Sequence, residues 1–369
     1  MSYPTLEEKL AALKVSPASE YERRCADALA PGSYEIGVQR TADILDEGYE
    51  IFMRSSRSSM GVAGDSIVAM FNAAGDLVNA SAGTYLHAVI PPIVIKYILA
   101  RHGENPGIND GDIWYTNDAL YGGIHNPDQV AIMPVFFGGE LVGWTAALSH
   151  TTETGAIEPG GMPLSAKARF EEGMNLPPMR VGTDFRLNND VIEMFAAFGL
   201  RAEANVTVDM RARATTADRV RVRLLEMFER EGKDFVLGLF RRMLDEAESG
   251  ARKRIASWSD GTYRCVTFSD AAGLEPGLLR NCSMTMTKKG DHLLIDFTGT
   301  SPETPSSYNA HPQAVVGHLA NYIYEYVFHD LPVSSATFQP IDFVFPPNSM
   351  LSPDVRAATS CSVMAATGA

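Results

Sequence analysis

One stretch in the first half of the chain concentrates the side chains that could do chemistry. Residues 117–155 read NDALYGGIHNPDQVAIMPVFFGGELVGWTAALSHTTETG and contain His125, Asp128 and His150. Two imidazoles and a carboxylate form a ligand set that suits manganese, iron(II) or zinc and leaves coordination positions open for a substrate. The same groups could instead be hydrogen-bonded loop residues. The choice depends on whether the fold brings them together.

A β-hairpin is predicted over residues 130–150. Two strand-like runs flank the paired glycines at 138–139, which are typical of a primed two-residue turn. This turn would place His150 opposite Pro127, with Asp128 as the diagonal neighbour. Because opposed side chains of an antiparallel pair have Cβ atoms about 5 Å apart, we expect one small ion to be within reach of both polar groups.

Two further features affect this hairpin. His125 precedes Asp128 by three residues and follows the bend at 122–123, which leaves its loop free to turn back. Pro134 cannot donate to a strand ladder and therefore predicts an edge strand or a bulge. A bulge would shift the register by one residue and turn His150 to the other face of the sheet.

Other titratable groups lie near the same stretch. Glu153 and Tyr121 are candidates for proton handling or for orienting a ligating histidine, and each is equally suited to a structural hydrogen bond. The remaining histidines lack an acidic or histidine partner at metal spacing, so core or surface roles are predicted for them. They are His87, His102, His292, His311, His318 and His329.

Composition narrows the class of protein. The 369 residues are 45% hydrophobic and 21% charged, an ordinary globular balance, and a net charge of −14 argues against nucleic acid or an anionic membrane as the main partner. The sequence shows no apolar run of about 20 residues and no leader, which predicts a cytoplasmic protein. Four scattered cysteines indicate neither a zinc ribbon nor a disulfide framework. Neither G-x-x-x-x-G-K-[ST] nor G-x-G-x-x-G occurs, so no phosphate cradle is recognised.

The elements predict an α+β fold with mixed antiparallel sheets and a long helical middle segment. Thr5 and Glu8 have the spacing of a capping box, and a strand, tight turn and strand are expected around residues 74–76. We expect three parts: residues 1–185, an α+β domain with the metal site; 186–258, helical; and 259–369, β-rich and apparently truncated at its C-terminal end.

Three long motifs carry a family resemblance. GDIWYTNDALYGGIHNPDQVAIMPVF, ELVGWTAALSHTTETGAIEPGGMP and IDFTGTSPETPSSYNA resemble the hydantoinase-B/5-oxoprolinase family, and within it most closely the acetone carboxylase alpha subunits. The resemblance implies a hydantoinase-B-like fold and one subunit of an ATP-dependent, biotin-independent enzyme that joins acetone and bicarbonate as acetoacetate. It also implies Mn²⁺ bound by His125, Asp128 and His150, with Zn²⁺ and Fe²⁺ less favoured.

The resemblance also implies partners. ATP-Mg would be handled by a hydantoinase-A-like beta subunit, and a small gamma subunit would complete the hetero-oligomer. Hydantoinase-type relatives tend to show a second histidine and an aspartate where this chain has Thr151, Thr152 and Glu153, which favours a ketone carboxylase. Three alternatives stay open: an acetophenone-type carboxylase subunit, a subunit of a hydantoinase or 5-oxoprolinase-type cyclic-amide hydrolase, and a non-catalytic scaffold. Family members are longer, and this sequence covers about their first half.

Overall fold

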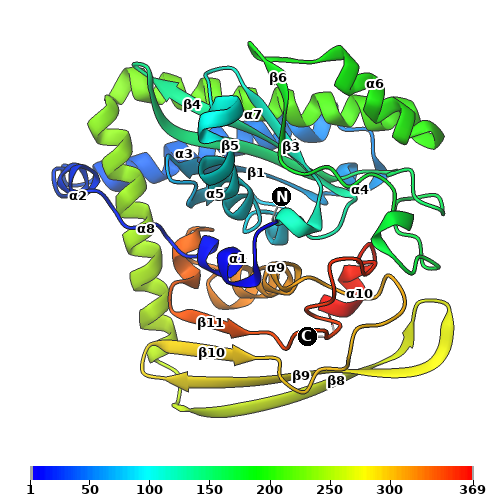
Figure 1. The fold of residues 1–369 in the computed structure, drawn as a ribbon. Helices are drawn as coiled ribbons and strands as arrows, with labels where there is room; N and C mark the ends of the chain where they lie inside the picture. Colours follow the sequence, from blue (N-terminus) through cyan, green and yellow to red (C-terminus); the bar gives the residue numbers. More distant parts are fainter. Residues whose placement is uncertain (1–2, 368–369) are drawn as a thin grey trace.

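The computed structural model describes residues 3–367, which form two sheets with helices around and between them. Figure 1 shows the larger sheet above the smaller one, with α1, α9 and α10 between them. The helices are α1 (Leu6–Ala12), α2 (Glu20–Asp27), α3 (Ser33–Ser55), α4 (Ser59–Val62), α5 (Pro91–His102), α6 (Asn189–Phe198), α7 (Glu203–Glu231), α8 (Lys233–Ala256), α9 (Pro312–Tyr322) and α10 (Ser362–Ala366).

The larger sheet has seven strands in the order β2-β1-β5-β4-β3-β6-β7, and all neighbours are antiparallel. Its strands are β1 (Ser66–Asn72), β2 (Leu77–Ala80), β3 (Ile113–Thr116), β4 (Asp128–Phe137), β5 (Glu140–His150), β6 (Met179–Thr183) and β7 (Arg186–Leu187). The predicted hairpin over residues 130–150 is therefore the β4–β5 pair at the centre of this sheet.

Both faces of the larger sheet are covered. Ala131 and Met133 of β4 join a core with α3, α7 and α8, whereas Val130 and Ile132 join a second core with α5 on the opposite face. Because successive side chains of a strand point to opposite faces, a strand covered on both sides has a continuous apolar run instead of an alternating one. This explains the runs in β1, β4 and β5.

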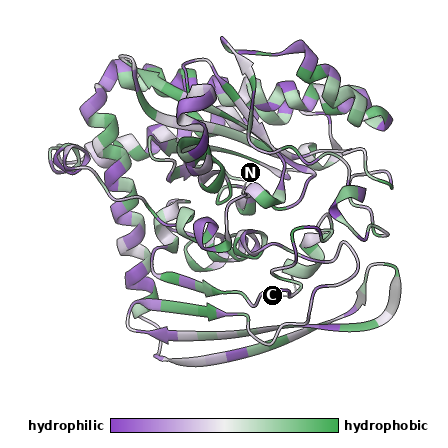
Figure 2. Cartoon of the chain, in the orientation of Figure 1, coloured by the Kyte–Doolittle hydropathy of each residue, from purple (hydrophilic) through white to green (hydrophobic). Residues whose placement is uncertain are grey.

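The smaller sheet has the order β11-β10-β9-β8, with β10 and β11 parallel and the other neighbours antiparallel. Its strands are β8 (Gly261–Ala272), β9 (Glu275–Lys289), β10 (His292–Asp296) and β11 (Ile341–Val344). Helix α8 connects the two layers along one side of the molecule (Figure 1), and the long β8–β9 ribbon mixes hydrophilic and hydrophobic residues (Figure 2). A third core packs α9 against this sheet.

Several local predictions are confirmed. The α+β class and the helical middle segment are present, and the Thr5–Glu8 capping box starts α1. Helix α5 begins at two prolines. N–H groups in the first turn of a helix have no acceptor within the helix, so the missing proline N–H groups cost no helical hydrogen bond. The turn around residues 74–76 joins β1 to β2. No helix within residues 3–367 is long and apolar enough to cross a membrane.

Candidate metal centre

The β4–β5 hairpin places His150 directly opposite Asp128. The glycines at 138–139 have φ values of +60° and +82°, as a primed turn requires, so the predicted turn is confirmed. Beyond it the register shifts by one residue, which leaves Val142 of β5 without a partner on β4. The predicted pairing of His150 with Pro127 is therefore wrong, because an extra residue lies between the turn and the site.

Of the two structural consequences predicted from Pro134, a bulge or an edge strand, only the bulge is found. A bulge was one of its two predicted consequences, and a register shift does occur between Val135 and Phe136. The other consequence, an edge strand, is wrong, since β4 lies between β5 and β3. The expectation that a bulge would move His150 away from the site is also wrong. The shift instead aligns it with Asp128.

The structure brings the three predicted ligands together in the interior. His125 Nε2 lies 3.0 Å from Asp128 Oδ2, and the two imidazole centroids are 5.2 Å apart. One ligand atom from each of His125, Asp128 and His150 lies within 4.8 Å of the others. Their exposed fractions are 4%, 4% and 6%. This compact, buried group has the donor types and the spacing of a metal centre.

The polar side-chain atoms of Asp128 and His150 lack hydrogen-bond partners within residues 3–367. Among residues 3–367, neither oxygen of Asp128 and neither ring nitrogen of His150 has a hydrogen bond of acceptable geometry. The 3.0 Å approach of His125 to Asp128 is thus a close contact whose atoms are not aligned for hydrogen bonding. Unpartnered buried polar groups are costly, and a shared cation would satisfy the Asp128 carboxylate together with one ring nitrogen of His150. The residues therefore fit a divalent metal.

Asp65 and His87 extend the group on the other side of Asp128. His87 Nε2 lies 2.8 Å from Asp65 Oδ1 and 3.9 Å from Asp128 Oδ1, and the three residues form a second set with metal-ligating spacing. The expectation that His87 has no acidic partner is wrong, and Asp65 was missed entirely. Asp65 immediately precedes β1, which pairs with β5, so a long-range strand pairing brings it to His150. The unbroken apolar run of β1 was the available signal of a central strand.

The charges of the group suit a cation. Burial opposes ionisation of Asp128, but the neighbouring His125 and His87 hold its pKa far below the usual range. Burial lowers the pKa of His150 to about 4, so its imidazole is neutral and ready to bind a metal. For His125 burial acts in the same direction, but Asp128 outweighs it and raises the pKa to about 9. A metal would have to displace that proton, which makes binding pH-dependent.

A buried carboxyl group fixes the orientation of one ligand. His125 Nδ1 lies 2.6 Å from the backbone oxygen of Ser360, and the Glu172 carboxylate accepts the N–H groups of Thr359 and Ser360 at 2.6 and 2.5 Å. If Nδ1 donates to that carbonyl, Nε2 is the free nitrogen facing Asp128. Burial raises the pKa of Glu172 to about 7. Neither Glu172 nor Ser360 was identified from the sequence.

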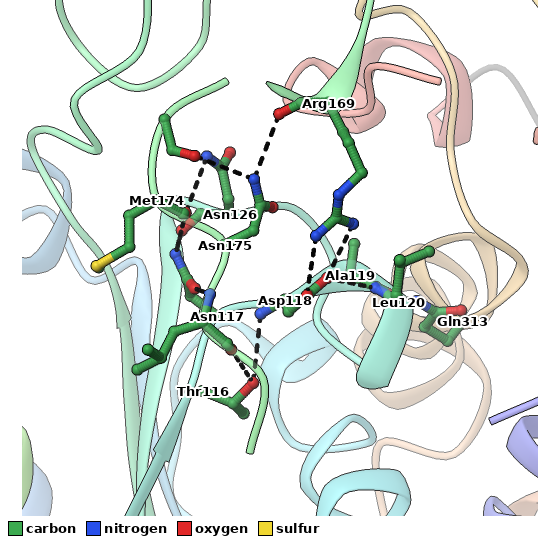
Figure 3. Close-up of polar contacts among 12 residues, drawn as sticks. Thr116, Asn117, Asp118, Ala119, Leu120, Asn126, Arg169, Met174, Asn175 and Gln313 are labelled. Atoms are coloured by element: carbon green, nitrogen blue, oxygen red, sulfur yellow. Dashed lines mark hydrogen bonds and ion pairs between the residues drawn. The ribbon is translucent and has the colours of Figure 1, made fainter. Parts of the chain in front are cut away.

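The loop before β4 is held by amide side chains. Asn117 Nδ2 donates to the carbonyls of Asn126 and Met174 at 2.7 and 2.9 Å, and its Oδ1 accepts the N–H of Leu176 at 2.6 Å. Figure 3 shows Asn117 beside Asn126 and Met174. Asn117 is buried, so its hydrogen bonds act in a region that excludes competing water.

A charged pair and a helix side chain hold the other end of this loop. Arg169 forms a two-pronged ion pair with Asp118, at 3.1 and 2.9 Å (Figure 3). Gln313 of α9 donates through Nε2 to the carbonyls of Ala119 and Gly123, at 2.6 and 2.9 Å. Segments far apart in the sequence thus fix the backbone from which His125 projects.

Glu153 and Tyr121 lie near the centre but have other contacts. The Glu153 carboxylate accepts the N–H of Gly155 at 2.7 Å and binds Arg201 at 3.0 Å. The Tyr121 ring packs edge-on against Tyr97 with centroids 5.1 Å apart. The contacts of Glu153 are structural hydrogen bonds, the alternative considered for it, whereas the Tyr121 contact is ring packing. The proposed part of both residues in proton handling stays a prediction.

Comparison with known proteins gives consistent relationships. The family model described as Hydantoinase B/oxoprolinase matches residues 31–368. The acetophenone carboxylase delta subunit of Aromatoleum aromaticum is 64% identical over all of this chain and 54% of its own length. The acetone carboxylase alpha subunit of Xanthobacter autotrophicus is 28% identical over 79% of this chain and 39% of its own length. The chain thus spans about half the length of these relatives or less.

Solved structures show the same fold. A nucleotide-free acetone carboxylase chain matches with a TM-score of 0.83 and 26% identity, over 89% of this chain and 45% of that chain. The ATP-dependent caprolactamase of Pseudomonas jessenii matches with a TM-score of 0.81 and 22% identity, over 91% of this chain and 58% of that chain. The second likeness concerns the fold alone. Both support the hydantoinase-B-like architecture expected from the sequence.

Proposed function

This chain belongs to the hydantoinase B/oxoprolinase family, and within that family we propose that it is the metal-bearing part of an ATP-dependent ketone carboxylase. Two of its relatives are named as subunits of acetophenone and acetone carboxylases. The observation that carries the proposal is the buried group of His125, Asp128 and His150, whose ligand atoms lie together. Within residues 3–367, those of Asp128 and His150 have no hydrogen-bond partner. Mn²⁺ is the proposed ion, with Zn²⁺ and Fe²⁺ as alternatives.

The proposed chemistry needs an enolate to meet carbon dioxide before water does. A divalent metal supplies Lewis-acid stabilisation of an enolate or phosphate oxygen. The chain itself contributes an anionic Asp128 and a neutral His150 as ligands, and burial of both excludes bulk water. Loss of water strengthens every electrostatic interaction in such a site.

ATP-Mg is assigned to a partner in this proposal. The sequence has neither of the two glycine-rich phosphate-binding patterns, and several relatives are named as subunits of larger enzymes. We propose a hydantoinase-A-like beta subunit for the nucleotide and a small gamma subunit. Bicarbonate and a small ketone are the other substrates.

An aryl methyl ketone is our first choice of substrate and acetone the second. The order follows from identities of 64% and 28% to the two carboxylase subunits. Cyclic-amide hydrolysis is the competing function, because a caprolactamase subunit is 28% identical over 70% of this chain. Thr151, Thr152 and Glu153 favour the carboxylase, since they replace the extra histidine and aspartate typical of hydantoinase-type relatives.

The test uses the complex in which the chain is isolated. With ATP-Mg and labelled bicarbonate, we expect acetophenone, and acetone less efficiently, to yield a labelled 3-oxo acid. His150→Ala should abolish labelling and release the metal, whereas His329→Ala, at an exposed position, should change neither. Opening of a hydantoin without labelling would support the hydrolase instead. Full metal content and turnover in His150→Ala would refute the site.

A further inference from the structure

One face of α9 contacts the loops that carry the metal-site residues. Gln313 and Asn321, two helical turns apart, both bond to these loops. Gln313 Nε2 donates to Gly123 O at 2.9 Å, and Asn321 Oδ1 accepts the N–H of Leu86 at 2.7 Å. Helix α9 is therefore fixed against both loops by hydrogen bonds at its start and its end.

Between these bonds the helix approaches the loops very closely. A Cβ atom added to Gly317 would lie 3.2 Å from Leu86 O and 3.4 Å from Ile124 Cδ1. Leu86 and Ile124 immediately precede His87 and His125 in the sequence. The backbone of α9 at Gly317 is thus in contact with the segments from which both histidines project.

Helix α9 also borders a largely apolar pocket of about 510 Å³, which Asn321 lines together with neighbouring residues of the helix. Ile295 and Phe297 line it from the end of β10, Leu319 and Tyr322 from α9, and Ala366 from α10. The volume lies within the range of about 300–1,000 Å³ that is typical of small-molecule sites, and such sites are mostly apolar with few polar groups. Nothing in the proposed metal chemistry has yet used this pocket.

His318 is the pocket residue that follows Gly317, where α9 contacts the segments before His87 and His125. It follows Gly317 and forms part of the pocket lining, yet its Nε2 is buried without a hydrogen-bond partner within residues 3–367. Burial depresses its pKa to about 4, and the charges of His125 and Asp128 also act on it. The imidazole is neutral at physiological pH, lines the pocket and lies within the electrostatic influence of the cluster.

We propose that this pocket is the hydrocarbon subsite of the metal centre and binds the ring of an aryl ketone, with His318, which follows Gly317 in α9, as the wall residue toward the cluster. The assignment rests on the proposed function for the choice of ketone. Phe297 and Tyr322 offer ring faces and edges against which an aromatic group packs favourably. Acetone would leave most of such a pocket unfilled, so the pocket determines specificity.

Direct binding tests this proposal without any catalysis. Fluorine NMR of 4-fluoroacetophenone, added to the isolated complex without ATP or bicarbonate, measures its affinity. Leu319→Trp fills the pocket and should weaken binding about tenfold or more. Leu294→Trp adds the same bulk to the opposite face of β10, where the side chain is 39% exposed, and should leave affinity unchanged.

A second variant guards against misfolding of the first. Tyr322 is 60% exposed, so Tyr322→Ala should fold normally and weaken binding of the aryl ketone severalfold. Equal affinity in the wild type, Leu319→Trp and Tyr322→Ala would overturn the subsite. So would an absence of binding in the wild type, which would mean that another segment or subunit fills the pocket.

The outcomes also separate this proposal from the proposed function. Pocket-dependent ketone binding in a complex that never fixes labelled bicarbonate would refute the carboxylase and retain the subsite. Carboxylation of acetophenone with an unchanged KM in Leu319→Trp would support the carboxylase and refute the subsite. A rise in KM for acetophenone larger than that for acetone, with metal content unchanged, would support both.

Discussion

Asp128 is the residue on which the two halves of the polar group converge. His125 and His150 lie on one side of its carboxylate, and the Asp65–His87 pair lies on the other. A carboxylate that serves two sets of donors must be held ionised, and its neighbours depress its pKa accordingly. Residues that position the proposed ligands without touching this carboxylate test the site better than the ligands themselves, because their removal leaves all the proposed ligands present.

Glu172 is such a probe. Glu172→Ala removes the acceptor that fixes the backbone at Thr359 and Ser360, so His125 should lose its fixed orientation. We expect metal affinity to fall about 10- to 100-fold, measured by competition with a chelator. Glu158→Ala removes an exposed-loop carboxylate that bonds to Ser165 and should leave affinity unchanged. Equal affinities in both variants would contradict the positioning role.

The same carboxyl group predicts a pH dependence of stability. Its pKa is about 7 in the folded protein against a usual value of 4.5, so the folded state holds the extra proton between these values. Stability from this group is therefore present below about pH 4.5 and is lost as the pH rises to about 7, by no more than about 3 kcal/mol. Unfolding in urea at several pH values should show a shallower decline for Glu172→Gln. An unchanged slope would contradict the assignment.

At the scale of elements, the sequence predicted features that depend on a few neighbouring residues, such as turns and bulges. The glycines at 138–139 defined the hairpin turn, and Pro134 indicated the bulge, because glycine and proline act through their own backbone. The direction of the one-residue shift at His150 was not predictable, since it depends on which strand carries the extra residue. His87 was missed because its partners arrive through the pairing of β1 with β5.

The contribution of α9 was equally invisible in the sequence. Only the packed structure shows which face of α9 meets the loops before His87 and His125. Glu172 accepts a hydrogen bond from the backbone of Ser360, which lies 188 residues further along the sequence. Contacts at such separation leave no periodic signal, because periodicity reports only the face that an element buries.

Gly317 tests the part played by α9. Gly317→Val would push a branched side chain against Leu86 O and Ile124, so the helix or the loops must move apart. We expect unfolding free energy to fall by about 1–3 kcal/mol and metal retention to fall with it. Gly103→Val is the control, because Gly103 has open space around it at the end of α5. Full metal retention in Gly317→Val would show that α9 does not support the site.

At the scale of the molecule, the candidate metal centre lies where elements of both layers meet. The ligands project from segments of the larger sheet, whereas Ser360 precedes α10 and α9 packs on the smaller sheet. Figure 1 shows α9 and α10 between the two sheets. A metal bound here would hold ligands of the larger-sheet layer and, through the contact of His125 with Ser360, the segment before α10. We therefore expect it to act on the stability of the whole described chain.

Calorimetry of the complex with and without bound metal tests that consequence. A ligand that binds only the folded state at 100 times its Kd adds about 2.7 kcal/mol, so Mn²⁺ should raise the unfolding temperature and a chelator should lower it. Because both layers contribute to the site, we expect this chain to unfold in one transition that moves as a unit. His150→Ala should lose the metal-dependent shift, and His329→Ala should keep it. Two transitions, of which only one responds to metal, would show that the layers unfold independently and that the site belongs to one of them.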